Sequence, residues 1–102
     1  MTTVRIEETQ KQITIHLKGH AEYDGTGRDI VCASCSVLIQ SLVNALCVMG
    51  IRNKWQQGDG EVKLTFEKAA GWKGAYTVAV TGYRMLADSY PKNVKMIIEG
   101  AG

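Results

Sequence analysis

The chain has 102 residues, of which 45% are hydrophobic and 22% are charged. This composition is typical of a soluble globular protein, and the length suits one hydrophobic core, so we expect a single domain over residues 1–102. The net charge of +2 is too small to indicate a nucleic-acid-binding protein. Three cysteines without a recognisable secretory signal favour a reducing, cytoplasmic location over a disulfide scaffold.

Two segments near the start of the chain alternate polar and apolar residues. Residues 3–8 and 13–18 each place one apolar face on a core, which is typical of half-buried β-strands. The connection between them is short enough for a hairpin. This phasing puts His16 on the solvent face of the sheet.

A polar loop is expected at residues 22–28, where Gly25 and Gly27 occur with almost no apolar side chain. We expect this loop to be mobile, with the two glycines as its hinge. Asp29 has the chemistry of a helix N-cap, because its carboxylate can accept a hydrogen bond from a backbone N–H group of the first turn. Cys32 is then the third residue of the helix.

The first helix is expected to run to about Met49, with Gly50 as its stop. No charged residue occurs from Ile30 to Ile51, a run about as long as a membrane span. However, hydroxyl and amide side chains recur within this run and would lack partners in a bilayer. The apolar residues form two stripes, which predicts a helix that is buried on most of its circumference and does not cross a membrane.

The second half of the chain predicts a hairpin, a helix and a strand. Asp59-Gly60, between residues 51–57 and 61–67, is a hairpin signal. Apolar residues then recur at helical spacing from Ala75 to Tyr90, and residues 94–98 form a final strand. The resulting order ββαββαβ predicts an α+β fold, with two helices on a mostly antiparallel sheet.

Cys32 is the first candidate for a chemical role. The unsatisfied N–H groups at a helix start favour the thiolate, which is the nucleophilic form of cysteine. Cys47, within the apolar part of the helix, is expected to be buried and inert. His20 ends the second strand and would accept the thiol proton and return it to a leaving amine. Gly19 would allow a sharp turn or the close approach of a substrate backbone.

Two other kinds of site compete with this interpretation. Cys32 and Cys35 form a C-x-x-C motif, as in thiol–disulfide redox proteins, where one sulfur attacks and the other resolves the mixed disulfide. A zinc site would have only His16, His20 and Cys47 to add, without the usual ligand spacing. Both alternatives stay open, although a cysteine nucleophile with a histidine base needs neither a metal nor another cofactor.

A non-enzymatic interaction module is a further alternative. The doubly apolar first helix and the three tyrosines of the second helix suggest a surface that a partner covers. The same features favour a homodimer, because twofold dimers are the commonest oligomers.

A family resemblance is carried by Gly19-His20-Ala21 and Asp29-Ile30-Val31-Cys32-Ala33, followed by Ser36 and a later Tyr90-Pro91. These motifs resemble those of the bacterial ribosomal-processing cysteine protease (Prp) family over essentially the whole chain. The resemblance implies a small dimeric cysteine endopeptidase that removes the N-terminal extension of a ribosomal large-subunit protein during ribosome assembly. That precursor would be its partner and substrate, and no direct contact with nucleic acid or with a membrane is expected.

The resemblance also implies roles for single residues. Cys32 would be the nucleophile and His20 the general base of a Cys–His dyad. Gly19, Asp29 and Ser36 would support the site.

Three further expectations concern the start of the helix and the loop before it. Backbone N–H groups around Cys32 and Ala33 would hold the oxyanion of an acyl-transfer reaction, and the loop with Gly25 and Gly27 would close over the substrate peptide. Cys35 departs from the family, which more often has a plain apolar residue there. It would either fill the core or form a reversible disulfide with Cys32.

Overall fold

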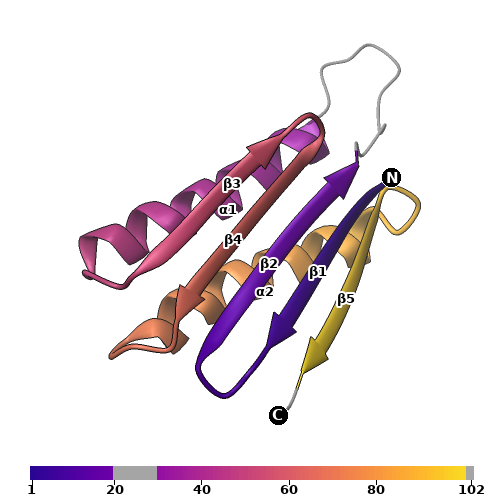
Figure 1. Ribbon diagram of the computed structural model, residues 1–102. Helices are drawn as coiled ribbons and strands as arrows, with labels where there is room; N and C mark the ends of the chain where they lie inside the picture. The colour runs from indigo at the N-terminus through magenta and orange to yellow at the C-terminus, as the bar shows by residue number, and fades with distance from the viewer. Residues whose placement is uncertain (20–29, 101–102) are drawn as a thin grey trace.

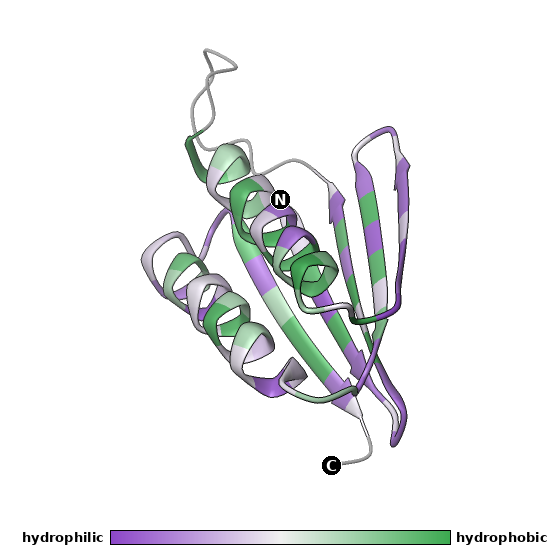
Figure 2. Ribbon diagram, turned by 90° about the vertical axis from the view of Figure 1, so that its left-hand side faces the viewer, coloured by the Kyte–Doolittle hydropathy of each residue, from purple (hydrophilic) through white to green (hydrophobic). Residues whose placement is uncertain are grey.

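The computed structural model of the chain describes residues 1–19 and 30–100. These residues form β1 (Thr2–Glu8), β2 (Gln12–Gly19), α1 (Ile30–Val48), β3 (Asn53–Gly58), β4 (Glu61–Glu67), α2 (Trp72–Ser89) and β5 (Val94–Gly100). The strands make one sheet in the order β3-β4-β2-β1-β5, in which β1 and β5 are parallel and all other neighbours are antiparallel. Both helices cover the same face of this sheet (Figures 1 and 2). The predicted α+β fold and the order ββαββαβ are confirmed.

The alternating side chains divide the sheet into a core face and a solvent face, as the sequence predicts. Val4 and Ile6 of β1 face the helices and are completely buried, while Arg5 between them forms an ion pair with Glu99 of β5 on the other face. His16 also lies on the solvent face, where it contacts the carboxylate of Glu61. The core therefore lies entirely between the sheet and the two helices (Figure 2).

The first helix is buried along one stripe only, formed by Val31, Cys35, Ile39, Leu42 and Leu46. The expectation that it is covered on two sides is wrong within the single chain, because both helices lie on one face of the sheet and their outer surfaces stay open. Ile30, Val37 and Val48 are exposed large apolar side chains on that outer surface. The length and mean hydropathy of α1, 1.9, would also suit a membrane span, but a core helix of a soluble protein meets the same criterion.

The end of α1 follows the predicted stop. Gly50 has a left-handed backbone, with φ +74°, and its N–H group donates to the carbonyl of Cys47. The N–H group of Ile51 donates to the carbonyl of Leu46, so the pair of hydrogen bonds forms a Schellman motif. Ile51 is buried and closes the helix end, and β3 consequently begins at Asn53 rather than at residue 51.

The second helix begins at Trp72, three residues before the predicted start at Ala75. Gly71 precedes it in the left-handed conformation, with φ +87°. The indole of Trp72 packs near Phe66 and Tyr76, with ring centroids 6.4 and 5.4 Å away. This aromatic cluster stabilises a helical turn that the local glycines disfavour.

The two helices contact each other through a glycine. A Cβ atom added to Gly82 of α2 would lie 2.6 Å from the side chain of Leu38 in α1, which is too close for a normal contact. The missing side chain thus lets α2 approach α1. Tyr83, next to it, is completely buried between the layers.

Candidate active site

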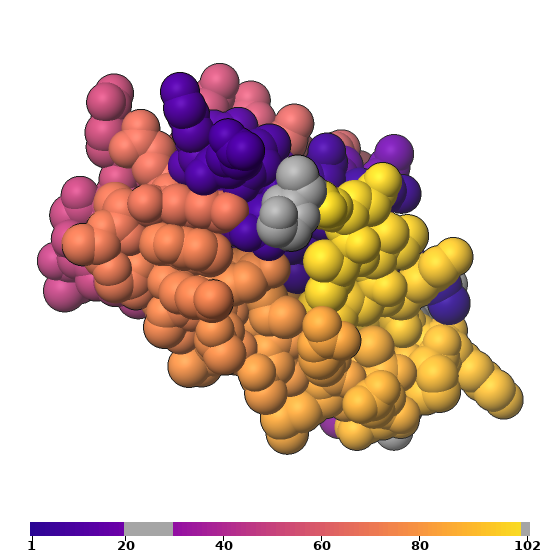
Figure 3. All heavy atoms as spheres, turned by 90° about the horizontal axis from the view of Figure 1, so that it is seen from below, coloured from indigo at the N-terminus to yellow at the C-terminus, as the bar shows by residue number. Residues whose placement is uncertain are grey.

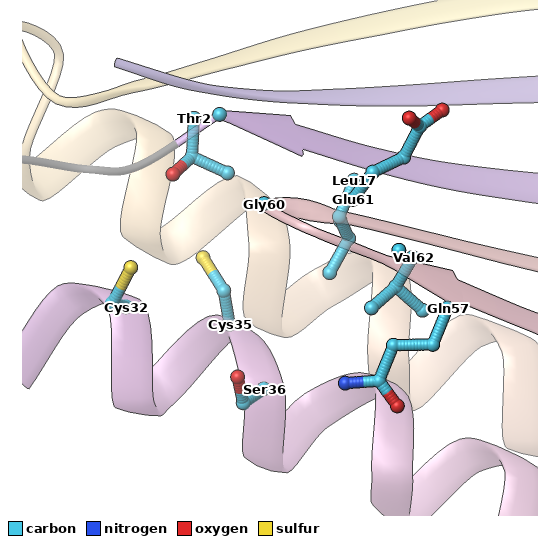
Figure 4. A pocket seen from close by; sticks show the side chains of 11 residues that line it. Thr2, Leu17, Cys32, Cys35, Ser36, Gln57, Gly60, Glu61 and Val62 are labelled. Carbon is cyan, nitrogen blue, oxygen red and sulfur yellow. The ribbon is translucent and has the colours of Figure 1, made fainter.

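A pocket of about 180 Å³ lies at the end of the sheet where β2 finishes and α1 starts. Its lining comes from β1, β2, the β3–β4 hairpin and the first turns of α1, and Figure 4 shows how the side chains lie. The chain places the β3–β4 turn, the start of β1 and the first turns of α1 at this same end (Figure 1). Figure 3 shows the opposite end of the molecule, where the β1–β2 turn, the start of α2, the end of β5 and the α1–β3 connection lie. The lining residues are Thr2, Leu17, Gly19, Cys32, Cys35, Ser36, Gln57, Gly58, Gly60, Glu61 and Val62.

Cys32 is the third residue of α1 and half-buried, as predicted. Its sulfur points from the helix towards the sheet and into the pocket (Figure 4). The first four N–H groups of a helix have no partner within the helix. Cys32 therefore lies in the turn whose backbone N–H groups point out of the helix start.

The turn of α1 that carries the cysteines is held from behind by α2. The hydroxyl of Tyr83 donates a hydrogen bond of 3.0 Å to the backbone carbonyl of Cys35. Burial raises the pKa of Tyr83 far above its ordinary value, so the hydroxyl stays protonated and remains a donor. The sequence suggested this tyrosine as part of a partner surface, but its complete burial makes it a core residue that positions the site.

Gly19 has a backbone that a side chain would not tolerate. Its φ is +98°, and an added Cβ atom would lie 2.3 Å from the backbone carbonyl oxygen of Met1. Its N–H group donates to the carbonyl of Gly60 across 2.8 Å, which ties β2 to the β3–β4 turn. The expected sharp backbone is thus present, but the backbone that approaches Gly19 is the chain's own first residue.

The other predicted site residues divide into three groups. Ser36 lines the pocket with Cys32, whereas Ala33 lies on a separate groove between the outer faces of α1 and α2. His20, Asp29, Gly25 and Gly27 lie outside the described residues. The dyad, the N-cap and the hinge therefore stay predictions.

The remaining two cysteines behave differently from each other. Cys35 is buried, and its sulfur points to the same pocket as that of Cys32 (Figure 4). Cys47 is exposed at the far end of α1, near the side-chain amide of Asn53, so the prediction that it is buried is wrong. One residue along a helix turns the side chain by about 100°, which takes Cys47 away from the buried stripe that contains Leu46.

The pocket also contains residues that the sequence did not single out. Thr2 at the start of β1 and Gln57 and Val62 of the β3–β4 hairpin reach it because the sheet order brings these strands together. No sequence motif marks them. Within residues 1–19 and 30–100, no group of three or more His, Cys, Asp and Glu side chains is arranged to hold a metal ion.

A family model described as cysteine protease Prp matches residues 1–95. The chain belongs to this family. Membership of the Prp family makes it a cysteine peptidase, the first of the alternatives that the sequence left open. A comparison with curated proteins gave no significant match.

Three solved structures resemble the whole fold. The ribosomal processing protease Prp from S. aureus with a covalently linked product peptide has 20% identity and a TM-score of 0.82, covering 96% of this chain and 99% of its own. The same S. aureus protease with a substrate peptide has 19% identity and a TM-score of 0.76, with the same coverage. SMU.848 from Streptococcus mutans has 24% identity and a TM-score of 0.77, covering 99% of this chain and 96% of its own. At these identities the likeness establishes the Prp-like fold.

Proposed function

We propose that this peptidase is a cytoplasmic endopeptidase that removes the N-terminal extension of a ribosomal large-subunit protein during ribosome assembly. The observation that carries the proposal is the sulfur of Cys32, which points into a pocket from the first turn of α1 in a chain of the Prp family. The S. aureus relative with the same fold is a ribosomal processing protease whose structures include a substrate peptide and a product peptide. The three cysteines are thiols rather than disulfides, in keeping with a reducing compartment.

The proposed reaction is acyl transfer through a Cys–His dyad. Cys32 Sγ attacks the scissile carbonyl while His20 takes the thiol proton, and His20 then returns the proton to the departing amine. Backbone N–H groups around Cys32 and Ala33 stabilise the oxyanion. Water hydrolyses the resulting thioester, which restores the thiol and releases the new carboxylate.

The test is to incubate the purified protein with a precursor ribosomal protein and to identify the new N-terminus by mass spectrometry. Cys32→Ala and His20→Ala should each abolish cleavage. Cys47→Ala is the matched control, because Cys47 is a thiol on the same helix but exposed at its other end. Full activity of Cys32→Ala would refute the peptidase mechanism, and an inactive wild-type protein would refute the choice of substrate.

We also propose that the enzyme is a homodimer that pairs through the groove between the outer faces of α1 and α2. Two large apolar side chains, Val37 of α1 and Met85 of α2, expose 62% and 65% of their surface along one groove of about 420 Å³. Val37→Glu should produce monomers in sedimentation equilibrium. Val48→Glu, at the far end of α1 where the valine is 90% exposed, should leave the dimer intact. A monomeric wild-type protein would refute this proposal.

A further inference from the structure

The pocket contains a buried hydroxyl group that the fold does not use. Thr2 is 3% exposed, and its Oγ1 atom is the one buried side-chain oxygen or nitrogen of the described residues that lacks a hydrogen-bond partner. A buried hydroxyl without a partner costs about 1–3 kcal/mol of stability. Such a group is rare in a native core and needs an explanation.

The position of Thr2 in the sheet does not supply that explanation. Its side chain is on the core face of β1, two residues before Val4 and four before Ile6, both completely buried apolar residues. Valine has nearly the same shape as threonine and would fill the same space without leaving a polar atom unpaired. Packing alone therefore favours valine at residue 2.

The backbone holds Thr2 firmly in place. Its N–H group donates to the carbonyl of Asn93 across 2.8 Å, and the residue pairs with Gly19 on one side and with Val94 on the other. The hydroxyl is thus carried by a central strand rather than by a loop. A rigid support of this kind suits a group whose position matters for a reaction.

The direction of the hydroxyl connects it to the nucleophile. Thr2 lines the same pocket as Cys32, and Figure 4 shows its oxygen pointing from the sheet towards α1 while the sulfur of Cys32 points from α1 towards the sheet. A peptide whose scissile carbonyl lies at the sulfur would have its neighbouring main chain within the same pocket. The main chain of a peptide offers carbonyl oxygens, which are good acceptors for a hydroxyl donor.

We propose that Thr2 is a substrate-binding residue of the peptidase, whose hydroxyl donates a hydrogen bond to a main-chain carbonyl of the bound peptide next to the scissile bond. The proposal rests on the assignment of Cys32 as nucleophile in the proposed function. The hydroxyl lacks a partner until substrate enters, and the bond then aligns the scissile carbonyl with Cys32. Because the acceptor is main chain, the contact improves the rate for peptides of many sequences.

The test compares two reagents that alkylate Cys32. Acetyl-Ala-Ala-Ala chloromethyl ketone presents a peptide main chain to the site, whereas iodoacetamide presents none, so the ratio of their labelling rates isolates main-chain binding. Labelling of Cys32 is followed by mass spectrometry of its tryptic peptide, together with the melting temperature of each variant. This measurement does not require the ribosomal substrate, so its failure is distinct from a failure to cleave that substrate.

Thr2→Val should lower this ratio by about 5- to 10-fold, the loss of one neutral hydrogen bond, while its melting temperature stays the same or rises. Thr2→Ser should keep the ratio near that of the wild type, because it keeps the hydroxyl. Thr3→Val is the matched control, since residue 3 lies on the opposite face of the same strand. A ratio within twofold of wild type in Thr2→Val would overturn the proposal. A fall in both labelling rates and in the melting temperature of Thr2→Val would also overturn the proposal, because the hydroxyl would then stabilise the fold rather than bind the substrate.

Discussion

Replacing Tyr83 by phenylalanine removes one hydrogen bond from the core and keeps the packing of the ring. The hydroxyl is completely buried and donates to the carbonyl of Cys35 across 3.0 Å. A neutral hydrogen bond of this kind contributes about 0.5–1.5 kcal/mol, and 1 kcal/mol shifts the melting temperature of a domain of this size by about 4–8 °C. We therefore expect Tyr83→Phe to melt about 2–12 °C lower than the wild type at pH 7.

The same hydroxyl should make the stability of the wild type depend on alkaline pH. Burial raises the pKa of Tyr83 above its ordinary value of 10.0, and the nearby Cys35 thiol adds to this rise when ionised. The folded chain therefore holds the phenolic proton more tightly than the unfolded chain does. The protonated Tyr83 hydroxyl therefore makes its full contribution to the free energy of unfolding below pH 10. This contribution is lost as the pH rises above 10, by at most about 1.4 kcal/mol per pH unit.

The measurement is urea unfolding, followed by circular dichroism at pH 8, 10 and 11, on the wild type and on Tyr83→Phe. The wild type should be the more stable protein at pH 8, and the difference should shrink or reverse at pH 11. Tyr76→Phe serves as a graded control, because burial also raises the pKa of Tyr76 but leaves that side chain partly in solvent. A difference between wild type and Tyr83→Phe that stays constant from pH 8 to pH 11 would refute the assignment.

Three further predictions concern the glycines and the second cysteine. Gly19→Ala should destabilise the fold by about 1–3 kcal/mol and lower peptidase activity in urea unfolding and cleavage assays, because of its positive φ and the close backbone carbonyl. In Gly58→Ala the added methyl group meets no atom within 4 Å, so the free energy of unfolding in urea should stay unchanged. Gly74→Ala should stabilise α2 by up to about 1 kcal/mol, because alanine favours a helix more than glycine does and no atom lies within 4 Å of the added methyl group. Gly82→Ala should be about 1–3 kcal/mol less stable than Gly74→Ala in thermal melts, because its methyl group would collide with Leu38 of α1. Cys35→Ala should keep cleavage activity, since one thiol suffices for acyl transfer. An inactive but folded variant would show that cleavage also needs the Cys35 thiol.

The local parts of the fold could be predicted from the sequence because their signals are local. The alternation in residues 3–8 and 13–18 sets both strands and their core faces, and Gly50 sets the end of α1. The parallel pairing of β1 with β5 carries no comparable signal. It depends on where α2 places the last strand, which is a property of the packed chain.

The site could be predicted only where the neighbouring residues in the sequence indicate a residue's place in the fold. The place of Cys32 near a helix start follows from the loop and cap residues before it. In contrast, an uncharged helix gives little sign of which side faces the core, so the exposure of Cys47 was missed. The unpaired hydroxyl of Thr2 was missed because a threonine in a strand is ordinary until its neighbours are known.

The pairing of β1 with β5 also sets the order in which the enzyme can become active during its own synthesis. Val94 pairs with Thr2 across 94 − 2 = 92 residues of chain, and the N–H group of Thr2 is bonded to the carbonyl of Asn93. Contacts between such distant residues form late in folding, because the long intervening loop must be closed first. The wall of the pocket that contains Thr2 is therefore completed only when β5 has left the ribosome and paired with β1. Until then the nascent chain has an incomplete peptidase site and exposes the unpaired edge of β1.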